Sequence, residues 1–257
     1  MRSSEKRYLT GLPPESAAVV IAVRSLVFNA LFYVVLAAYL VAALPTLLMP
    51  RWGIIGLARH WAGVNLALLR VVCGITVAWR GLDKIPPGAA LIAAKHQSAW
   101  ETFALLTLFR DPAFILKREL LWIPFYGWYA RHAGMIPVER GGGKPALVAM
   151  GERARRELAA GRQIVVFPEG TRRPPGAEPR YKFGIAHLYG ACGAPCVPIA
   201  LNSGLFWPRR RFLRYPGTIT VEVLDPIAPG LPVEVFLARL QEVIEAATAR
   251  LIAQARA

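Results

Sequence analysis

Residues 163–172 read QIVVFPEGTR, and this stretch decides how the rest of the fold is interpreted. Its first half, Gln163 to Phe167, is a short apolar run of the kind that forms a fully buried strand. The strand leads directly into a turn with a carboxylate, a glycine and an arginine. In open α/β sheets, ligands bind at the loops that follow strands, so this turn is a candidate site. Its candidate residues are Glu169, Gly170, Thr171 and Arg172.

Strand-like and helical patterns alternate on both sides of this stretch, from residue 73 to the end of the chain. Such alternation is typical of α/β units, and we expect one α/β domain over residues 73–257. The other expected strands are Ile75–Arg80, Ala89–Ala94, Ala113–Leu116, Cys196–Leu201 and Thr218–Val223. The expected helices are Thr102–Phe109, Lys144–Ala160, Phe183–Cys192 and an amphipathic helix from Pro232 onward.

The N-terminal part of the chain has a different character. No charged residue occurs from Ser25 to Pro50. A helix of this length would reach roughly 35 Å, against about 30 Å for the hydrocarbon core of a bilayer. We therefore expect residues 1–72 to form membrane-anchoring helices. Basic residues flank the run on both sides, so the positive-inside rule sets no orientation. Three arrangements of this segment remain open. It could be a helix that spans the bilayer, a bent pair of helices in one leaflet with its bend at Pro45 to Gly53, or a buried hairpin of the core.

The composition limits the class of protein. Of the 257 residues, 55% are hydrophobic and 18% charged, with a formal net charge of +15. Nucleic acid, anionic lipid headgroups and acidic carrier proteins would all be attracted to such a surface. The basic residues are scattered, and no RNA-binding signature or helix-turn-helix pattern is present, so a nucleic-acid-binding module is only the alternative. The stretch Arg209 to Arg211 with Arg214 either contacts headgroups or a carrier protein, or forms a solvated loop.

The three cysteines, Cys73, Cys192 and Cys196, fit neither a disulfide framework nor a zinc site, and we expect reduced thiols. No set of metal ligands is visible in the sequence. We therefore expect neither a metal nor a cofactor.

A second candidate site is the stretch KHQSAWE, Lys95 to Glu101, which follows an expected strand and opens an expected helix. A neutral imidazole takes a proton from an alcohol near pH 7, and a carboxylate orients the ring. His96 and Glu101 are thus a candidate base and its partner. Ser98 and Glu101 also fit a capping box, and both interpretations can hold together.

Two further turns and one strand complete the pattern. The stretch GMIPVER ends in Arg140, and Lys117 precedes Glu119 and Leu120. An arginine fork binds phosphate, although a single arginine in a loop is usually only solvated. The apolar strand VPIAL contains Pro198 and is either a plain core strand or part of a pocket.

These four blocks resemble, in residues and in order, those of the glycerolipid acyltransferases, in particular the bacterial 1-acylglycerol-3-phosphate acyltransferases. The resemblance covers about residues 75–225. The family's first block has His, four residues, then Asp, whereas this chain has Glu101 after His96. The second block matches Lys117 and the stretch from Pro137 to Arg140. Phe167 to Arg172 reproduces the third block without change, and Pro198 matches the fourth.

The resemblance implies a mixed sheet flanked by helices and an enzyme that transfers a fatty acyl chain to the sn-2 hydroxyl of lysophosphatidic acid. The implied donor is acyl-CoA or acyl carrier protein. His96 is the implied base and Glu101 its orienting partner. Lys117, Arg140 and Arg172 would bind phosphate, Glu169 would bind the glycerol or brace the arginines, and Pro198 would line the acyl pocket. Glycerol 3-phosphate, lyso-ornithine lipid or another lysolipid remain alternative acceptors. A non-catalytic membrane protein with the same fold also remains possible. The expected location is the inner membrane, with the domain facing the cytoplasm.

Overall fold

The computed structural model describes residues 14–139 and 141–257 and centres on a seven-stranded sheet of order β1-β7-β6-β2-β5-β3-β4. Among the neighbouring strands of this sheet, β6 and β7 are antiparallel and the other pairs are parallel. The sheet is therefore mixed, as expected. The strands are β1 (Ile75–Arg80), β2 (Ala90–Ala94), β3 (Pro112–Lys117), β4 (Ile136–Val138), β5 (Gln163–Val166), β6 (Cys196–Leu201) and β7 (Gly217–Val223).

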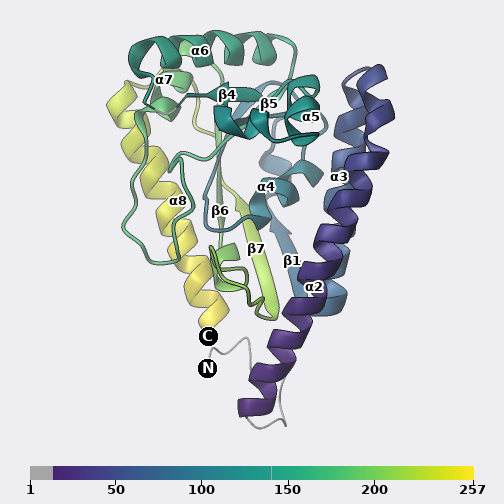
Figure 1. Cartoon of the computed structure of the whole chain (residues 1–257). Helices are drawn as coiled ribbons and strands as arrows, with labels where there is room; N and C mark the ends of the chain where they lie inside the picture. Colours follow the sequence, from purple (N-terminus) through teal and green to yellow (C-terminus); the bar gives the residue numbers. More distant parts are fainter. Residues whose placement is uncertain (1–13, 140) are drawn as a thin grey trace.

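Helices cover both faces of this sheet (Figure 1). The α-helices are α2 (Pro14–Ala42), α3 (Trp52–Leu68), α4 (Trp100–Ala104), α5 (Tyr126–His132), α6 (Gly143–Ala159), α7 (Phe183–Cys192) and α8 (Val233–Arg256). The 3₁₀ turns are η1 (Leu44–Leu48), η3 (Leu82–Lys84), η4 (Leu105–Thr107), η5 (Arg118–Trp122) and η6 (Ser203–Leu205), and η2 (Leu69–Cys73) is a π-helical turn. Helix α6 shows how local signals set the bounds: Pro145 lies in its first turn, and Gly161 follows its end at φ +78°.

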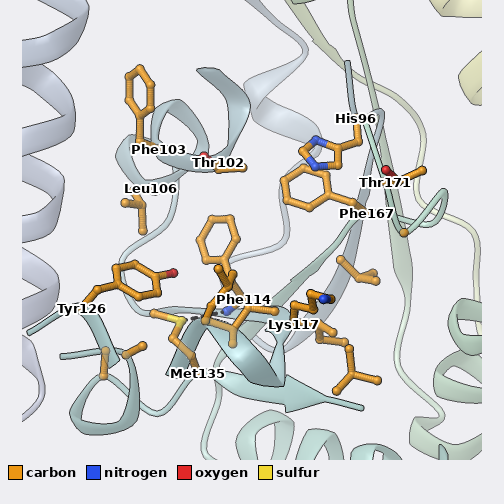
Figure 2. Close-up of a pocket in the computed structure, with 18 of the residues that line it drawn as sticks. His96, Thr102, Phe103, Leu106, Phe114, Lys117, Tyr126, Met135, Phe167 and Thr171 are labelled. Atoms are coloured by element: carbon orange, nitrogen blue, oxygen red, sulfur yellow. Dashed lines mark hydrogen bonds between the residues drawn. The ribbon is translucent and has the colours of Figure 1, made fainter. Parts of the chain in front are cut away.

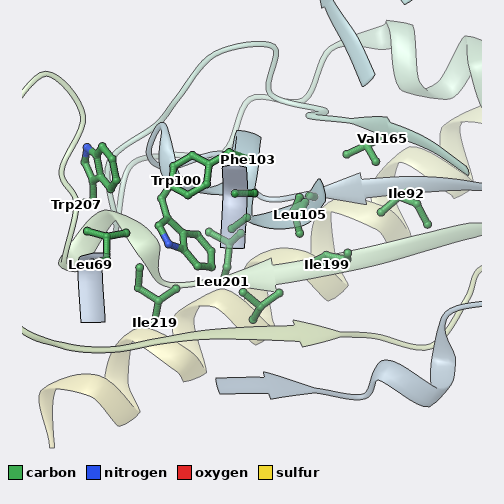
Figure 3. Close-up of a cluster of buried hydrophobic side chains, with 14 of the residues drawn as sticks. Leu69, Ile92, Trp100, Phe103, Leu105, Val165, Ile199, Leu201, Trp207 and Ile219 are labelled. Atoms are coloured by element: carbon green, nitrogen blue, oxygen red, sulfur yellow. The ribbon is translucent and has the colours of Figure 1, made fainter. Parts of the chain in front are cut away.

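Alternate residues along the strands pack into two separate hydrophobic cores, one on each face of the sheet. Ile92, Val165 and Ile199 pack with residues of α2, α3 and α4, including the fully buried Trp100 (Figure 3). Their sequence neighbours, such as Ile164, pack on the opposite face against α6, α7 and α8. The period of two along a strand produces this division. Helices α2 and α8 thus lie on opposite sides of the sheet.

Helix α2 packs on the domain along most of its length. Near its start, Ala17 and Ile21 contact Leu213 and Tyr215. Near its end, the Tyr129 hydroxyl donates a hydrogen bond to the carbonyl of Leu40, 2.5 Å away. Its outward face is apolar and exposed at Val19, Val23, Leu26, Tyr33, Val34 and Val41. The helix is therefore docked on one side and bare on the other, so it is not a buried core helix.

The bend after α2 lies where the sequence indicated. The chain turns through η1 and Met49–Arg51 before α3 begins at Trp52, so the bend falls within the expected Pro45 to Gly53. By length and composition, the stretch Glu15–Leu48 is one helical segment among the described residues that could cross a membrane, and only 11% of its most apolar window is buried.

Two elements were not predicted. Strand β4 has only three residues with a proline at its centre, and α5 mixes three aromatic residues with Gly127. Neither is long enough to show a clear periodicity. Both form because neighbours hold them: β4 pairs with β3, and Tyr129 of α5 packs against Ala43 and Ile54.

Candidate active site

The site lies at one edge of the sheet, where five neighbouring parallel strands end. Strands β6, β2, β5, β3 and β4 are adjacent and run in the same direction. Their carboxyl ends therefore meet at a single edge. His96 follows β2, the PEGTR turn follows β5, Lys117 ends β3, and Ser203 follows β6. The sheet order thus brings together turns that are far apart in the sequence.

His96 and Glu101 form a hydrogen-bonded pair. The Nδ1 atom of His96 lies 2.9 Å from Oε1 of Glu101, whose side chain is fully buried. A carboxylate accepts hydrogen bonds, so Nδ1 carries the proton and donates it to Glu101, which leaves the Nε2 lone pair free. The Phe167 ring stacks on the imidazole at 4.1 Å between ring centroids and 18° between planes. Ring orientation and tautomer are both fixed before any substrate binds.

Glu101 has its other acceptor positions filled as well. Oε1 also accepts the backbone N–H groups of Gln97 (2.6 Å) and Ser98 (2.7 Å), and Oε2 accepts the hydroxyl of Ser203 (2.8 Å). The Ser98 hydroxyl in turn accepts the N–H of Trp100. The capping contacts and the histidine contact therefore coexist, and the same carboxylate serves both.

Over residues 14–139 and 141–257, Glu169 is paired with a lysine and not with Arg172, contrary to one expectation. Its fully buried carboxylate accepts a hydrogen bond from Lys95 Nζ at 2.7 Å and another from the backbone N–H of His96 at 2.9 Å. Burial raises the pKa of the Glu169 carboxyl, and the Lys95 ammonium opposes that rise. Lys95 also bonds to Glu245 of α8, at 2.6 Å. Glu169 thus fixes the backbone of His96 because it is held to a cation in the core.

A largely apolar cavity of about 1350 Å³ opens beside His96 (Figure 2). His96, Phe167 and Thr171 lie on one side of the view, with Phe103, Leu106 and Tyr126 on the other. The cavity extends to Leu36, Tyr39, Ile54, Ile55 and Trp61 of α2 and α3. A space of this size and polarity fits the acyl chain of a lipid.

Five of the six expected substrate-binding residues line this cavity: Lys117, Glu169, Gly170, Thr171 and Arg172. Gly170 adopts φ +63°, a conformation that side chains disfavour, and the turn needs it there. Burial lowers the pKa of Arg172, with a further contribution from the charge of Arg209, while Glu101 opposes the change. Lys117 is half exposed and lies 2.9 Å from Glu119. Arg140 lies outside the described residues.

Pro198 does not line the cavity. It lies in the buried strand β6 and pairs in register with Ala93 of β2. Its neighbours in the strand, Val197 and Ile199, face the core that contains Trp100, so the proline faces α8 on the other side of the sheet. The alternative interpretation, a plain core strand, is the correct one for this position.

The structure adds residues that motif reasoning did not select. Lys95 and Ser203 contact the two carboxylates that hold His96, and Arg209 lines the cavity. A lysine directly after a buried five-residue strand was a usable signal for Lys95. Ser203 had none, because the sequence does not reveal that β6 lies beside β2.

Arg214 is not available to headgroups or a carrier protein, contrary to one interpretation of the basic stretch. It is buried, and its guanidinium lies 4.2 Å from the ring centroid of Trp207. It also donates hydrogen bonds to Asn29 of α2 and to carbonyls of its own loop. Arg210 and Arg211 remain exposed.

The fold and the site together define a class: an α/β domain with a histidine–carboxylate pair at the mouth of a lipid-sized apolar cavity. Residues 76–202 match the model of the Acyltransferase family, and this part of the chain belongs to that family. The resemblance found in the four sequence blocks is thereby confirmed.

Individual relatives agree with this assignment. The chain is 39% identical over 165 residues to "1-acyl-sn-glycerol-3-phosphate acyltransferase" of Pseudomonas aeruginosa, covering 64% of each protein. It is 31% identical over 175 residues to the mouse "1-acyl-sn-glycerol-3-phosphate acyltransferase alpha", covering 64% of this chain and 61% of that protein. The matched region thus spans just under two thirds of the length of these relatives.

The fold is similar to the crystal structure of "the 1-acyl-sn-glycerophosphate (LPA) acyltransferase, PlsC, from Thermotoga maritima". The TM-score is 0.72 at 23% sequence identity, and the match covers 89% of this chain and 97% of that one. The similarity includes the mixed sheet and its flanking helices, which confirms the expected fold class.

Proposed function

We propose that this protein transfers a fatty acyl chain from a thioester donor, acyl-CoA or acyl carrier protein, to the sn-2 hydroxyl of lysophosphatidic acid. The product is phosphatidic acid. The observation that carries the proposal is the oriented pair of His96 and Glu101, which opens onto an apolar cavity also lined by Arg172. The names of the relatives at 39% and 31% identity support the same acceptor.

In this proposal His96 acts as the general base. Its Nε2 takes the proton of the acceptor hydroxyl as the oxygen attacks the thioester carbonyl. The tetrahedral intermediate then collapses, the carbon–sulfur bond breaks, and the imidazolium returns the proton to the leaving thiolate. Glu101 is fully buried and 2.9 Å from Nδ1, so it stabilises the imidazolium while it exists. No acyl-enzyme is required.

The acceptor's phosphate would be bound by Lys117 and Arg172, with Arg140 as a third candidate. An arginine offers phosphate two parallel N–H donors, and Arg172 lies on the cavity wall that also holds His96. The glycine at position 170 lets the backbone of the same turn come close to the ligand.

We further propose that α2 and α3 lie in one leaflet of the inner membrane, with the domain on the cytoplasmic side. Both ends of α2 contact the same domain, and its outward face exposes aliphatic side chains. A helix held in this way cannot cross the bilayer without taking the domain with it. Detection of residues 51–70 on the far side of the membrane by cysteine labelling would refute this placement.

The first test is acyl transfer by detergent-purified protein given lysophosphatidic acid and labelled acyl-CoA or acyl carrier protein. Wild type should form phosphatidic acid, and His96→Ala should lower kcat by roughly 10³-fold or more with an unchanged thermal midpoint. The better donor identifies the carrier. Product from both proteins at equal rates would refute the role of His96. Absence of product with either donor would refute this acceptor, and lyso-ornithine lipid and glycerol 3-phosphate would be tested next.

A further inference from the structure

The loop that follows β6 is held at both ends. At its start, Ser203 donates a hydrogen bond to Glu101, and the Gly204 N–H donates one to Gln97. At its end, Arg214 packs on Trp207 and bonds to Asn29 of α2. The segment between these anchors carries Arg209. This arginine is therefore placed by the fold rather than free in solvent.

Arg209 reaches the same cavity as His96 and Arg172. Its Nη1 donates a hydrogen bond to the backbone carbonyl of Arg172 at 2.7 Å. Its Nε is buried and has no hydrogen-bond partner within the described part of the chain. The positive charge of Arg209 also helps to lower the pKa of Arg172, so the two guanidinium groups are close enough to repel.

Among the described residues, these two arginines lack the carboxylate partner that Lys117 has at the same cavity. Lys117 is paired with Glu119, and the two carboxylates on the wall, Glu139 and Glu169, are paired with Arg118 and Lys95. Over residues 14–139 and 141–257, neither Arg172 nor Arg209 lies within 4.0 Å of a carboxylate. A bound anion that contacts both would relieve their repulsion.

We infer that Arg209 is a second headgroup residue, which selects an acceptor with a phosphomonoester over one with a phosphodiester. This inference rests on the proposed function and names the class of acceptor at that site. A phosphomonoester carries about −1.5 to −2 charges near pH 7 and has three terminal oxygens, enough for two guanidinium groups. A phosphodiester carries one charge and two such oxygens, and the second guanidinium gains less from it.

The test compares lysophosphatidic acid with lysophosphatidylglycerol as acceptors for wild type, Arg209→Ala and Arg209→Lys. Arg209→Ala should raise the KM for lysophosphatidic acid by about tenfold, with little change in kcat. The preference for lysophosphatidic acid, as a ratio of kcat/KM values, should fall by a similar factor. Arg209→Lys should give intermediate values, because the charge stays and the fork is lost.

Arg211→Ala is the matched control. Arg211 lies in the same loop and is exposed, so its removal deletes the same charge outside the cavity. Its kinetics should equal those of wild type. Equal losses in Arg209→Ala and Arg211→Ala would overturn the inference. So would an equal loss on both acceptors, or a fall in kcat without a rise in KM. The last result would mean that Arg209 only braces the backbone of Arg172.

The inference can fail separately from the proposed function. If wild type shows no turnover, equilibrium binding of lysophosphatidic acid and lysophosphatidylglycerol in detergent still compares Arg209→Ala with wild type. A selective loss for the phosphomonoester would support Arg209 as a headgroup residue, even with the acyl transfer refuted. Equal binding of both lipids by both proteins would overturn the inference.

Discussion

The surroundings of His96 and the outward face of α2 differ in which side chains they bury and which they expose. Around His96, three charged groups are buried and paired: Glu101, Glu169 and Lys95 each have charged or N–H partners within hydrogen-bonding distance. On α2, apolar groups are exposed and unmatched, with Tyr33 and Val34 about two thirds exposed. Unpaired polar groups are costly in a protein interior, and apolar side chains are costly in water. The three charged groups beside His96 therefore find their partners within the chain, whereas the apolar face of α2 would gain from a non-aqueous environment.

The largest expected effect comes from a change that removes the charge of Glu101 beside His96 but keeps its hydrogen bonds. Glu101→Gln keeps an oxygen for the N–H groups of His96, Gln97 and Ser98 and an amide that donates to Ser203. Only the negative charge opposite the imidazolium is lost. We expect kcat to fall by about 10³-fold with nearly unchanged KM, as measured by steady-state kinetics. A fall of less than tenfold would show that orientation alone accounts for the role of Glu101.

The second prediction concerns the buried ion pair of Lys95 and Glu169. Lys95→Met leaves Glu169 buried beside His96 without its cation. Removing one partner of a buried pair costs about 3–5 kcal/mol, so the thermal midpoint in detergent should fall by about 10 °C. Lys84→Met is the control, because Lys84 pairs with Asp225 at the surface and its removal should leave the midpoint unchanged. Equal midpoints for wild type and Lys95→Met would contradict the structural role of the pair.

The third prediction concerns the unmatched face. Val34→Glu places a charge among the exposed aliphatic residues of α2 and should lower partitioning into lipid vesicles about tenfold, with the fold intact. Val235→Glu makes the same change at an exposed position of α8, on the other side of the sheet, and should have no effect. Vesicle flotation measures both. Similar losses in the two variants would mean that the protein does not meet the bilayer through α2.

The smallest effect is a pH dependence. Burial raises the pKa of Glu169, and Lys95→Met removes the cation that opposes this, so the pKa rises further. A carboxyl with a higher pKa in the folded state stabilises the fold below its unfolded pKa and loses that contribution as pH rises. The deficit of Lys95→Met should therefore shrink as the pH falls from about 8 towards 5, by at most about 1.4 kcal/mol per unit. In Lys95→Met/Glu169→Gln the titrating group is gone, and a remaining slope of the same size would contradict this assignment.

The sequence was informative where a signal is local. The bounds of α7 and β6 are those predicted, and the pairing of His96 with Glu101 needs only five residues of chain. It was uninformative where partners are distant. Ser203 reaches Glu101 because β6 lies beside β2, and Glu245 reaches Lys95 because one face of α8 crosses the sheet near β2. Periodicity identifies an apolar face but not the strand that it will cover, so the sequence alone could not predict these contacts. The role proposed for Pro198 failed for a related reason, since alternation decides which side of a sheet a residue faces.

The order of partners along the chain also has a consequence for biosynthesis. Synthesis proceeds from the N-terminus, so α2 leaves the ribosome before any strand of the sheet. Glu169, which bonds to the backbone of His96, is synthesised about 70 residues after it. Ser203, which bonds to Glu101, is synthesised about 100 residues after Glu101. The exposed apolar face of α2 is therefore synthesised before Glu169 and Ser203, which complete the contacts around His96 and Glu101. If α2 binds lipid as proposed, a nascent chain would meet the bilayer before the contacts that hold His96 in place are complete.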